Sequence, residues 1–390
     1  MCCLGFSAFS QSRHVMRVQL PEQIKSILIP TKSGYDAYFQ LYYAGNMAMY
    51  DFLEQGDKVE MRWQVYDEKD QKEPIYLDSS YLTTQNFEYN QRCALFKLKL
   101  PPTASEELII SVKFTQKVRR HTLIFLKRIR VRQHVSGFWL SKSYGAFPYL
   151  HSYTHLKDSL LLNSIHGNNR RITISKYQSD TVALPPMSMD NVELKRKVIF
   201  NEEVLSGNFW KPREPGFYVI KDSLFVNTIY VHHNQIFPMV TKAAQCIPPL
   251  IYISTNDERT ALNDANEPYK KRLDNFLLSV FEHKEVAQKF MKAYFNRIET
   301  VNELFTSSTE GWKTDKGMLY LIFGTPDRVY LETDAHDWSY EKNPLYNELN
   351  FYIKQYPDTW GGTYDKMERL ADYQKIWYGL IDKWRKGLIK

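Results

Sequence analysis

The spacing of the apolar residues changes near residue 259, and this change constrains the fold more than any other feature. Before it, apolar residues alternate with polar ones, as at Val59, Met61 and Trp63. This period of two is typical of half-buried strands. After it, apolar residues recur every three or four positions between Val286 and Phe305, which is the spacing of an amphipathic helix. The sequence therefore predicts a mainly β protein with a C-terminal part that mixes helices and strands.

The β region is long enough for two domains, because one domain usually takes about 100–200 residues. Turn signals separate its short strands, which is typical of antiparallel β-sandwiches. We therefore predict tandem β-sandwich-like domains over residues 12–135 and 136–258, followed by a helix-sheet-helix α+β domain over residues 259–390. Hydrophobic residues make up 43% of the chain, enough to exclude a disordered protein. A transmembrane span is excluded as well, because no apolar run reaches 18 residues.

Two strand patterns define the second β region. Ile172 and Ile174 alternate with polar residues, which predicts a half-buried strand. The segments 217–220 and 223–226 flank Lys221 and Asp222, which predicts a hairpin with a two-residue turn.

The chain begins with a short apolar stretch of ten residues that has small residues, Ala8 and Ser10, near its end before Gln11. This ending resembles a secretory cleavage site, although the basic start of such a peptide is missing. We interpret residues 1–11 as the remnant of a signal peptide, which predicts an exported protein. The alternative is an N-terminus that is apolar by chance.

One motif lies between the two predicted C-terminal helical segments. It reads Gly311-Trp312-Lys313-Thr314-Asp315-Lys316-Gly317 and continues through an apolar run to Gly324-Thr325-Pro326-Asp327. The motif resembles the GWxTD-domain family of Gram-negative envelope proteins, over roughly the last third of the chain. The family commonly has Arg at the position of Lys316, and the lysine keeps that charge. The resemblance implies a periplasmic or outer-membrane-associated protein with an accessory role in a secretion or outer-membrane assembly.

The motif residues also have structural explanations that do not depend on the family. Thr314 and Asp315 suit a turn whose side-chain oxygens accept bonds from nearby backbone N–H groups. Gly317 can take a positive φ angle, and Trp312 is expected in the core. We predict a buried strand over residues 318–323, a tight exit turn at residues 324–327, and further antiparallel strands around residues 329–331, 338–340 and 349–353. The C-terminal residues 370–388 predict a closing helix.

Catalytic chemistry has weaker support. Asp315, Asp327 and His336 are the right residue types for a metal or hydrolytic site, but no known metal-binding spacing accompanies them. Two histidine pairs are further candidate ligands: residues 151 and 155, and residues 232 and 233. The second pair is expected on a strand, where neighbours point to opposite faces. We therefore predict no catalytic, metal or cofactor site, and the hydrolase stays a lesser alternative.

The net charge of +7 permits anionic partners, but no nucleic-acid motif is present, so nucleic acid is not predicted. Arg128, Arg130 and Arg132 alternate with apolar residues. They form either a stripe for an anionic lipid, glycan or acidic protein, or a charged strand face that prevents edge pairing. The sequence leaves open whether Cys93 and Cys246 pair, and isolated buried thiols are the simpler reading.

These observations favour a non-enzymatic, exported envelope protein that serves as an accessory or scaffold subunit through protein–protein contacts. The main alternative is a carbohydrate-binding envelope protein, because aromatic residues reach 15% of the chain and can stack on sugar rings. Two aromatic clusters would serve either role if they are exposed: Tyr35, Tyr38, Tyr42 and Tyr43, and Trp360 with Tyr364.

Overall fold

The computed structural model describes residues 15–17, 20–43, 47–54, 58–116, 121–179, 181–188, 196–332, 334–341 and 345–389. The predicted signal-peptide remnant, residues 1–11, lies outside these residues. By its internal contacts the chain divides into two compact units. Unit 1 comprises residues 1–150, 160–170 and 206–208, and unit 2 comprises residues 151–159, 171–205 and 209–390. The predicted boundaries after residues 135 and 258 stay predictions.

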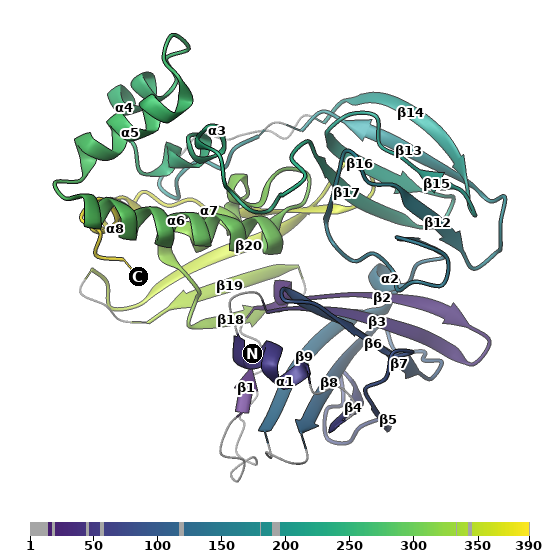
Figure 1. Cartoon of the computed structure of the whole chain (residues 1–390). Coiled ribbons are helices and arrows are strands. Elements are labelled where there is room, and N and C mark those ends of the chain that lie inside the picture. The colour runs from purple at the N-terminus through teal and green to yellow at the C-terminus, as the bar shows by residue number, and fades with distance from the viewer. Residues whose placement is uncertain are drawn as a thin grey trace. The chain divides into compact units, whose positions relative to one another are not determined.

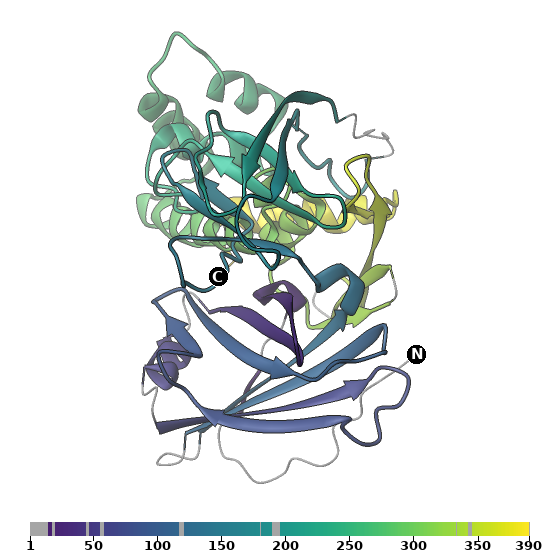
Figure 2. The same ribbon diagram turned by 90° about the vertical axis from the view of Figure 1, so that its right-hand side faces the viewer.

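Unit 1 contains a β-sandwich made of two sheets (Figures 1 and 2). Sheet I has the strand order β1-β9-β8-β4-β5: β1 (Val15–Arg17), β9 (His121–Arg130), β8 (Glu107–Gln116), β4 (Val59–Asp67) and β5 (Tyr76–Tyr81). Sheet II has the order β2-β3-β7-β6: β2 (Ile24–Thr31), β3 (Gly34–Tyr42), β7 (Cys93–Leu100) and β6 (Phe87–Tyr89). The unit also contains α1 (Met47–Leu53), α2 (Val131–His134), β10 (Phe138–Ser141) and β12 (Leu160–Ser164). All neighbours in the two sheets are antiparallel except β1 and β9.

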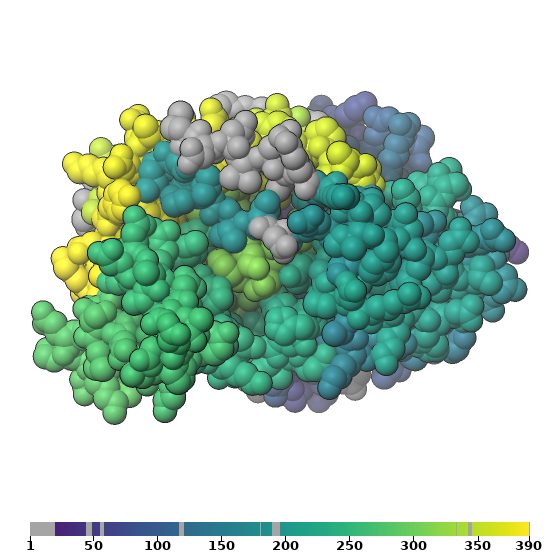
Figure 3. Space-filling model, turned by 90° about the horizontal axis from the view of Figure 1, so that it is seen from above, coloured from purple at the N-terminus to yellow at the C-terminus, as the bar shows by residue number. Residues whose placement is uncertain are grey.

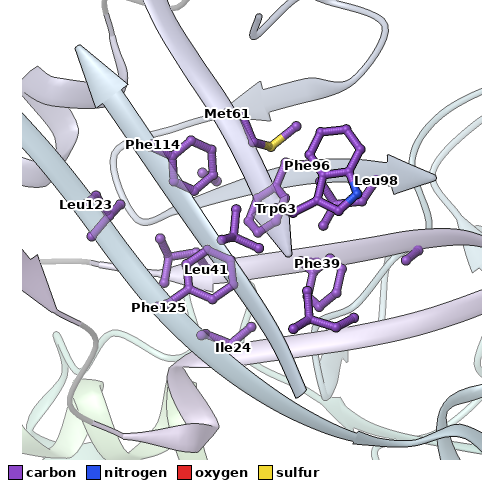
Figure 4. Packing of buried hydrophobic residues seen from close by; sticks show 14 of the residues in the cluster. Ile24, Phe39, Leu41, Met61, Trp63, Phe96, Leu98, Phe114, Leu123 and Phe125 are labelled. Carbon is purple, nitrogen blue, oxygen red and sulfur yellow. The ribbon is translucent and has the colours of Figure 1, made fainter. Parts of the chain in front are cut away.

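The core of unit 1 lies between these sheets (Figure 4). Alternate residues of the central strands point inward, so sheet I contributes Phe114 and Phe125 while sheet II contributes Phe39 and Phe96. The rings of Phe39 and Phe96 stack with centroids 5.3 Å apart, and Phe96 meets Phe114 edge to face at 5.3 Å. Aromatic pairs of this kind add to the free energy gained from burial alone. The predicted sandwich in the N-terminal region is therefore confirmed.

Unit 2 combines two sheets with most of the helices. Sheet III has the order β11-β17-β16-β13-β14: β11 (Tyr153–His155), β17 (Val226–His232), β16 (Gly216–Lys221), β13 (Arg171–Tyr177) and β14 (Val198–Leu205). Sheet IV has the order β18-β19-β20-β21: β18 (Arg328–Leu331), β19 (Ala335–Tyr340), β20 (Leu349–Pro357) and β21 (Thr363–Met367). The remaining strand is β15 (Phe209–Trp210), and the helices are α3 (Ala243–Cys246), α4 (Asn256–Leu262), α5 (Tyr269–Val280), α6 (Lys284–Phe305), α7 (Asp315–Phe323) and α8 (Tyr373–Arg385).

Helices α6, α7 and α8 lie against one face of sheet IV (Figure 1). Aromatic side chains form the contact: Phe305 of α6 packs on Trp338, and Phe323 of α7 packs on Phe351 with centroids 4.8 Å apart. Tyr373 of α8 contacts the same Phe351 ring at 4.7 Å. The predicted α+β arrangement of helices, an antiparallel sheet and a closing helix is confirmed.

Two local predictions were wrong. Residues 318–323 form most of helix α7 instead of a strand, because Thr314 caps this segment as a helix. The hairpin of sheet III has a four-residue loop, since Lys221 pairs with Val226 and the chain leaves the ladder at residues 222–225. There the Asp222 carboxylate accepts bonds from the N–H groups of Leu224 and Phe225, which stabilises the wider turn.

Helices α4 and α5 form part of the surface of unit 2 (Figure 3). Leu278 on α5 is 80% exposed, whereas Leu273 and Phe276 on the other side of the helix are buried. Helix α5 is therefore amphipathic: one side packs against the core of the unit and the other side faces solvent. Within the described part of the chain, no helix is both long and apolar enough to cross a membrane.

Candidate functional site

The motif begins with a single 3-10 turn, Gly311–Lys313, and continues into helix α7. Thr314 stands between the two as the N-terminal cap of α7. Its Oγ1 accepts a hydrogen bond from the N–H of Gly317 at 3.0 Å and donates one to the carbonyl oxygen of Gly311 at 2.8 Å. One hydroxyl therefore satisfies a free N–H of the helix and a carbonyl of the preceding turn. The predicted side-chain bond from Thr314 to a nearby N–H is confirmed.

The two glycines of the motif are needed for space. A Cβ atom on Gly311 would lie 1.9 Å from the carbonyl oxygen of Val301, and one on Gly317 would lie 1.8 Å from that of Gly311. Both obstacles are backbone atoms, so neither can move aside easily. Gly317 lies in helix α7, so the positive φ angle predicted for it is wrong. Among the described residues of the motif, 311–317 and 324–327, the positive φ angle belongs to Gly324, at +86°, where the chain leaves α7.

The end of helix α6 holds the motif turn through buried polar side chains. Asn302 and Thr306 are 2% and 3% exposed. The Thr306 hydroxyl accepts the N–H of Gly311 at 3.0 Å, and Asn302 Oδ1 accepts the N–H of Trp312 at 3.3 Å. The turn thus receives in the interior the bonds that water would otherwise supply.

Trp312 is buried, as predicted, and its indole N–H donates to Glu310 Oε2 at 2.8 Å. Lys313 Nζ contacts the other carboxylate oxygen at 3.0 Å and lies 5.3 Å from the centroid of the Trp312 ring. Burial opposes ionisation of Glu310, but Lys313, the Trp312 N–H and nearby His232 outweigh it and lower the pKa of this carboxyl. Glu310 is therefore held as a carboxylate beside the motif.

Asp315 and Lys316 bind the start of α7 to strand β21 and the residues after it. The Asp315 carboxylate accepts the N–H of Met367 at 2.8 Å and pairs with the Arg369 guanidinium at 2.5 Å. Lys316 Nζ pairs with Asp365 at 2.7 Å. The two side chains are 8% and 6% exposed, so both pairs lie largely inside the fold. The acceptor bond of Asp315 spans 52 residues and is not the local turn bond that we predicted.

Tyr252 and residues 183–186 close the other side of the motif. The Tyr252 hydroxyl lies 3.2 Å from the carbonyl oxygens of Trp312 and Ala183, and the N–H of Ala183 donates to the Lys313 carbonyl at 2.8 Å. Burial, with a further contribution from Asp315, raises the pKa of Tyr252 well above its usual range. The tyrosine is therefore a permanent hydrogen-bond donor in this structure.

A histidine cluster adjoins the motif. His232 Nδ1 accepts the N–H of Asn234 at 2.9 Å, and its ring stacks on Phe237 at 4.2 Å and on His233 at 4.5 Å. The expectation that the two histidines point apart was wrong, because β17 ends at His232 and the chain turns there. Burial lowers the pKa of His232 to about 4, despite the opposing effect of Glu310.

The other histidine pair is engaged in separate contacts. His151 Nδ1 lies 3.2 Å from the buried carboxylate of Glu303, which also accepts the Tyr153 hydroxyl at 2.7 Å. His155 lies between the Asp158 carboxylate at 3.0 Å and the Phe237 carbonyl at 2.9 Å.

The residues of the hydrolase alternative have different partners. Asp315 pairs with Arg369, Asp327 accepts the N–H of Glu341 at 2.7 Å, and His336 lies in β19 opposite Ile353. Within the described ranges, no group of three His, Cys, Asp or Glu side chains could hold a metal ion. Cys93 and Cys246 are both buried, and no disulfide joins them.

The three arginines of the predicted stripe have carboxylate partners in unit 1. Arg128 contacts Glu68 at 3.0 Å and Glu107 at 2.6 Å, and Arg130 contacts Glu107 at 3.0 Å. Arg132 lies in α2, outside the strand that we predicted for it, and reaches Glu106 at 3.6 Å.

The two aromatic clusters are less exposed than an open platform requires. Tyr42 and Tyr43 are 7% and 2% exposed, while Tyr35, Tyr38, Trp360 and Tyr364 are half-buried. Trp360 packs edge to face on Phe217, with centroids 5.7 Å apart. These rings therefore stabilise the fold, and the faces that remain available are small.

Sequence reasoning missed several residues that complete the site: Asn302, Thr306, Glu310, Tyr252 and Arg369. The carboxamide of Asn302 and the guanidinium of Arg369 act on motif residues 10 and 54 positions away. No periodicity marks a polar side chain that becomes buried in this way. Glu310 alone had a local signal, because it directly precedes Gly311.

Fold and site together define a class: a β-sandwich protein with a small α+β domain built around a buried Gly-Trp-x-Thr-Asp turn. Residues 216–386 match the family profile described as the GWxTD domain. The chain therefore contains a GWxTD domain over residues 216–386, as the motif indicated. The matched range begins at strand β16 of sheet III, upstream of the helices.

No curated protein matches the chain. Among solved structures, Salmonella alpha-2-macroglobulin reacted with methylamine is 10% identical, with a TM-score of 0.20, and the match covers 57% of this chain but 17% of that one. DIP-gamma IG1+IG2 is 10% identical at a TM-score of 0.14, covering 55% of this chain and 100% of that one. The C-terminal domain of the Streptococcus pyogenes antigen I/II-family protein AspA is 9% identical at 0.15, covering 54% and 99%. Scores this low carry no argument about fold or function.

Proposed function

We propose that this chain is a non-enzymatic, exported envelope protein that serves as an accessory or scaffold subunit of an outer-membrane or secretion assembly. The observation that carries the proposal is the use of the motif's polar groups. The Thr314 hydroxyl, the Asp315 carboxylate and the Lys316 ammonium are each bound inside the fold. A nucleophile or general base needs a partner that it can exchange during a reaction, whereas these groups fix a shape. The motif is thus a structural device that presents surfaces elsewhere on the domain.

The surface best suited to a partner is the edge of sheet III formed by strand β14. Among the described residues this strand pairs on one side only, with β13. Ile199 is 53% exposed, and Val198 and Leu205 are each more than a third exposed. An edge strand with apolar side chains and free backbone groups is a ready template for another extended chain. We therefore assign this edge to an extended segment of an envelope protein that adds to the sheet as a further strand.

The experiment compares three tagged forms of the full-length chain in native cells: wild type, Ile199→Lys and Leu224→Lys. Leu224 is 73% exposed and lies in the loop between β16 and β17, outside the β14 edge, so it is the matched control. Each form is cross-linked, recovered from detergent-solubilised envelopes and analysed by mass spectrometry. We expect stoichiometric outer-membrane or secretion components with wild type and Leu224→Lys, and loss of at least one of them with Ile199→Lys.

Two results would contradict the proposal. Recovery of the wild-type chain alone would remove the accessory role. Fractionation that places the chain in the cytosol would remove the envelope location, whatever it binds there. Recovery of identical partners with Ile199→Lys would move the contact away from β14 while leaving the accessory role in place.

A further inference from the structure

The described part of unit 1 contains a polar cleft of about 470 Å³ that no motif predicted. It lies at one end of the β-sandwich, between the β2–β3 turn, the end of β7 and the start of β5. Its volume falls in the usual range for small-molecule sites, about 300–1,000 Å³. Six of its lining side chains bear on the argument: Ser33, Tyr35, Asp36, Tyr76, Lys97 and Lys99.

The walls of the cleft are held in place by the fold. Gly34 has a φ angle of +136°, and a Cβ atom there would lie 2.1 Å from the carbonyl oxygen of Leu100. The β2–β3 turn is therefore pressed against the end of β7. Tyr35 and Tyr76 pack against the hydrophobic core, and the Tyr76 hydroxyl donates to Asp78 at 3.0 Å. The cleft is thus formed before any ligand arrives, which lowers the entropy lost on binding.

The charges of the cleft do not cancel. Lys97 pairs with Asp36 at 2.7 Å and lies 5.3 Å from the centroid of the Tyr38 ring. Lys99 lies opposite Asp36 in the β3–β7 register, is exposed, and has no ion-pair partner among the described residues. Two ammonium groups and one carboxylate leave a single positive charge that a bound anion would neutralise. A single charge of this kind suits a monoanion better than a polyphosphate, which needs several cations.

The remaining lining groups fit a ring that is apolar on its faces and polar at its edge. Tyr35 and Tyr76 offer aromatic surface for the C–H groups of such a ring. The Ser33 hydroxyl and the Asp36 carboxylate can bind hydroxyl groups, since both accept hydrogen bonds. We propose that the cleft binds an acidic sugar residue, with the sugar carboxylate on Lys99 and the sugar hydroxyls on Asp36 and Ser33. This site is independent of the β14 edge, which lies in unit 2.

The proposal is tested by calorimetric titration of the full-length chain at low salt with three sodium-matched probes. D-glucuronate has the ring and the carboxylate, D-glucose has the ring alone, and acetate has the carboxylate alone. We expect saturable binding of glucuronate, at least tenfold weaker binding of glucose, and no saturation by acetate. Added salt should weaken glucuronate binding, because the contact with Lys99 is ionic and solvent-exposed.

Two lysine variants decide whether the cleft is the site. Lys99→Gln should weaken glucuronate binding about tenfold and leave the melting temperature unchanged, because the side chain is exposed. Lys142→Gln removes an exposed lysine elsewhere in unit 1 and should bind like wild type. Failure of glucuronate to bind, equal binding by acetate, or unchanged binding by Lys99→Gln would each overturn the proposal. None of these outcomes bears on the partner contact proposed for the β14 edge, because that contact is tested by the recovery of cross-linked partners.

Discussion

Unit 1 and the motif region of unit 2 are stabilised in different ways. Between its two sheets, unit 1 buries an apolar core that includes Phe39, Phe96 and Phe125, and the ion pairs of Arg128 and Arg130 lie partly in solvent. The motif region places Asn302, Asp315 and Lys316 in the interior and satisfies each one with a specific partner. A position in an apolar core tolerates many side chains of similar volume, whereas a position that holds a buried, hydrogen-bonded polar group tolerates few substitutions. This difference explains why a short sequence motif identifies the motif region, whereas no short motif identifies the sandwich.

The largest expected effect is the loss of the buried Asp315 carboxylate. Asp315→Ala leaves the Arg369 guanidinium without its carboxylate and should lower the free energy of unfolding of unit 2 by about 3–5 kcal/mol. The matched change in unit 1 is Glu107→Ala, which removes the partner of Arg128 and Arg130 at a wetter site and should cost about 1 kcal/mol. Hydrogen exchange read by mass spectrometry on peptides from α7 and β8 measures both losses.

Replacing both partners is the control for this comparison. Asp315→Leu with Arg369→Leu removes the charges together and should recover most of the loss, because no lone charge then stays buried. Equal losses for Asp315→Ala and Glu107→Ala would show that the two units are stabilised alike.

The second prediction concerns space rather than charge. Gly317→Ala should destabilise unit 2 by about 3 kcal/mol, since the new Cβ would meet the carbonyl oxygen of Gly311 and the motif turn would have to move away from α7. Gly379→Ala in α8 should be nearly neutral, because its Cβ meets only the flexible side chain of Leu345 at 3.1 Å. Leu98→Met in the core of unit 1 should cost less than about 1.5 kcal/mol. Urea unfolding followed by hydrogen exchange ranks the three, and a Gly317→Ala variant as stable as Gly379→Ala would contradict the close approach.

The sequence predicts the part of this fold that depends on periodicity. Alternation located β4 and β7, and helical spacing located α6 and α8. The apolar pattern predicted the wrong element at residues 318–323, because a short apolar run fits a buried strand and a buried helix equally well. The deciding signal was Thr314 followed by Asp315, a helix-start pattern that we interpreted as a turn.

The site was less predictable than the fold. Trp312 and Thr314 have the roles that their residue types suggest. The partner of Lys316 lies in β21, and the partner of Asp315, Arg369, lies two residues after that strand. Both ion pairs therefore depend on how sheet IV packs against α7. The unit 1 cleft depends on the register that places Asp36 opposite Lys99. Neither arrangement has a local pattern in the sequence.

The third prediction uses acid to separate the motif region from its neighbours. The pKa of His232 is lowered from 6.5 to about 4 by burial, so the unfolded chain takes up a proton below pH 6.5 while the folded chain stays neutral. Stability therefore falls as the pH falls from 6.5, and the loss should reach about 2 kcal/mol at pH 5. His232→Gln should remove this dependence from unit 2 peptides. Unit 1 should keep its own, since burial also lowers the pKa of His134 to about 4. An unchanged pH profile in His232→Gln would assign the acid sensitivity to another group.

The smallest expected effect comes from loss of the N-terminal cap of α7. This change tests whether a local hydrogen bond in the motif stabilises α7 alone or the whole of unit 2. Thr314→Ala should cost about 1 kcal/mol, the usual value of a lost N-terminal cap, and Thr314→Ser should restore it because the hydroxyl is kept. Thr255 caps α4 with the same geometry, accepting the N–H of Glu258 at 3.3 Å, so Thr255→Ala should lose a similar amount. The two variants should differ in which peptides exchange hydrogen faster. Helix α4 is a surface element, so Thr255→Ala should speed hydrogen exchange in α4 alone. Helix α7 packs on sheet IV, so Thr314→Ala should speed hydrogen exchange in every slowly exchanging peptide of unit 2. If Thr314→Ala affected only α7, the motif would be a local cap rather than the centre of the domain's stability.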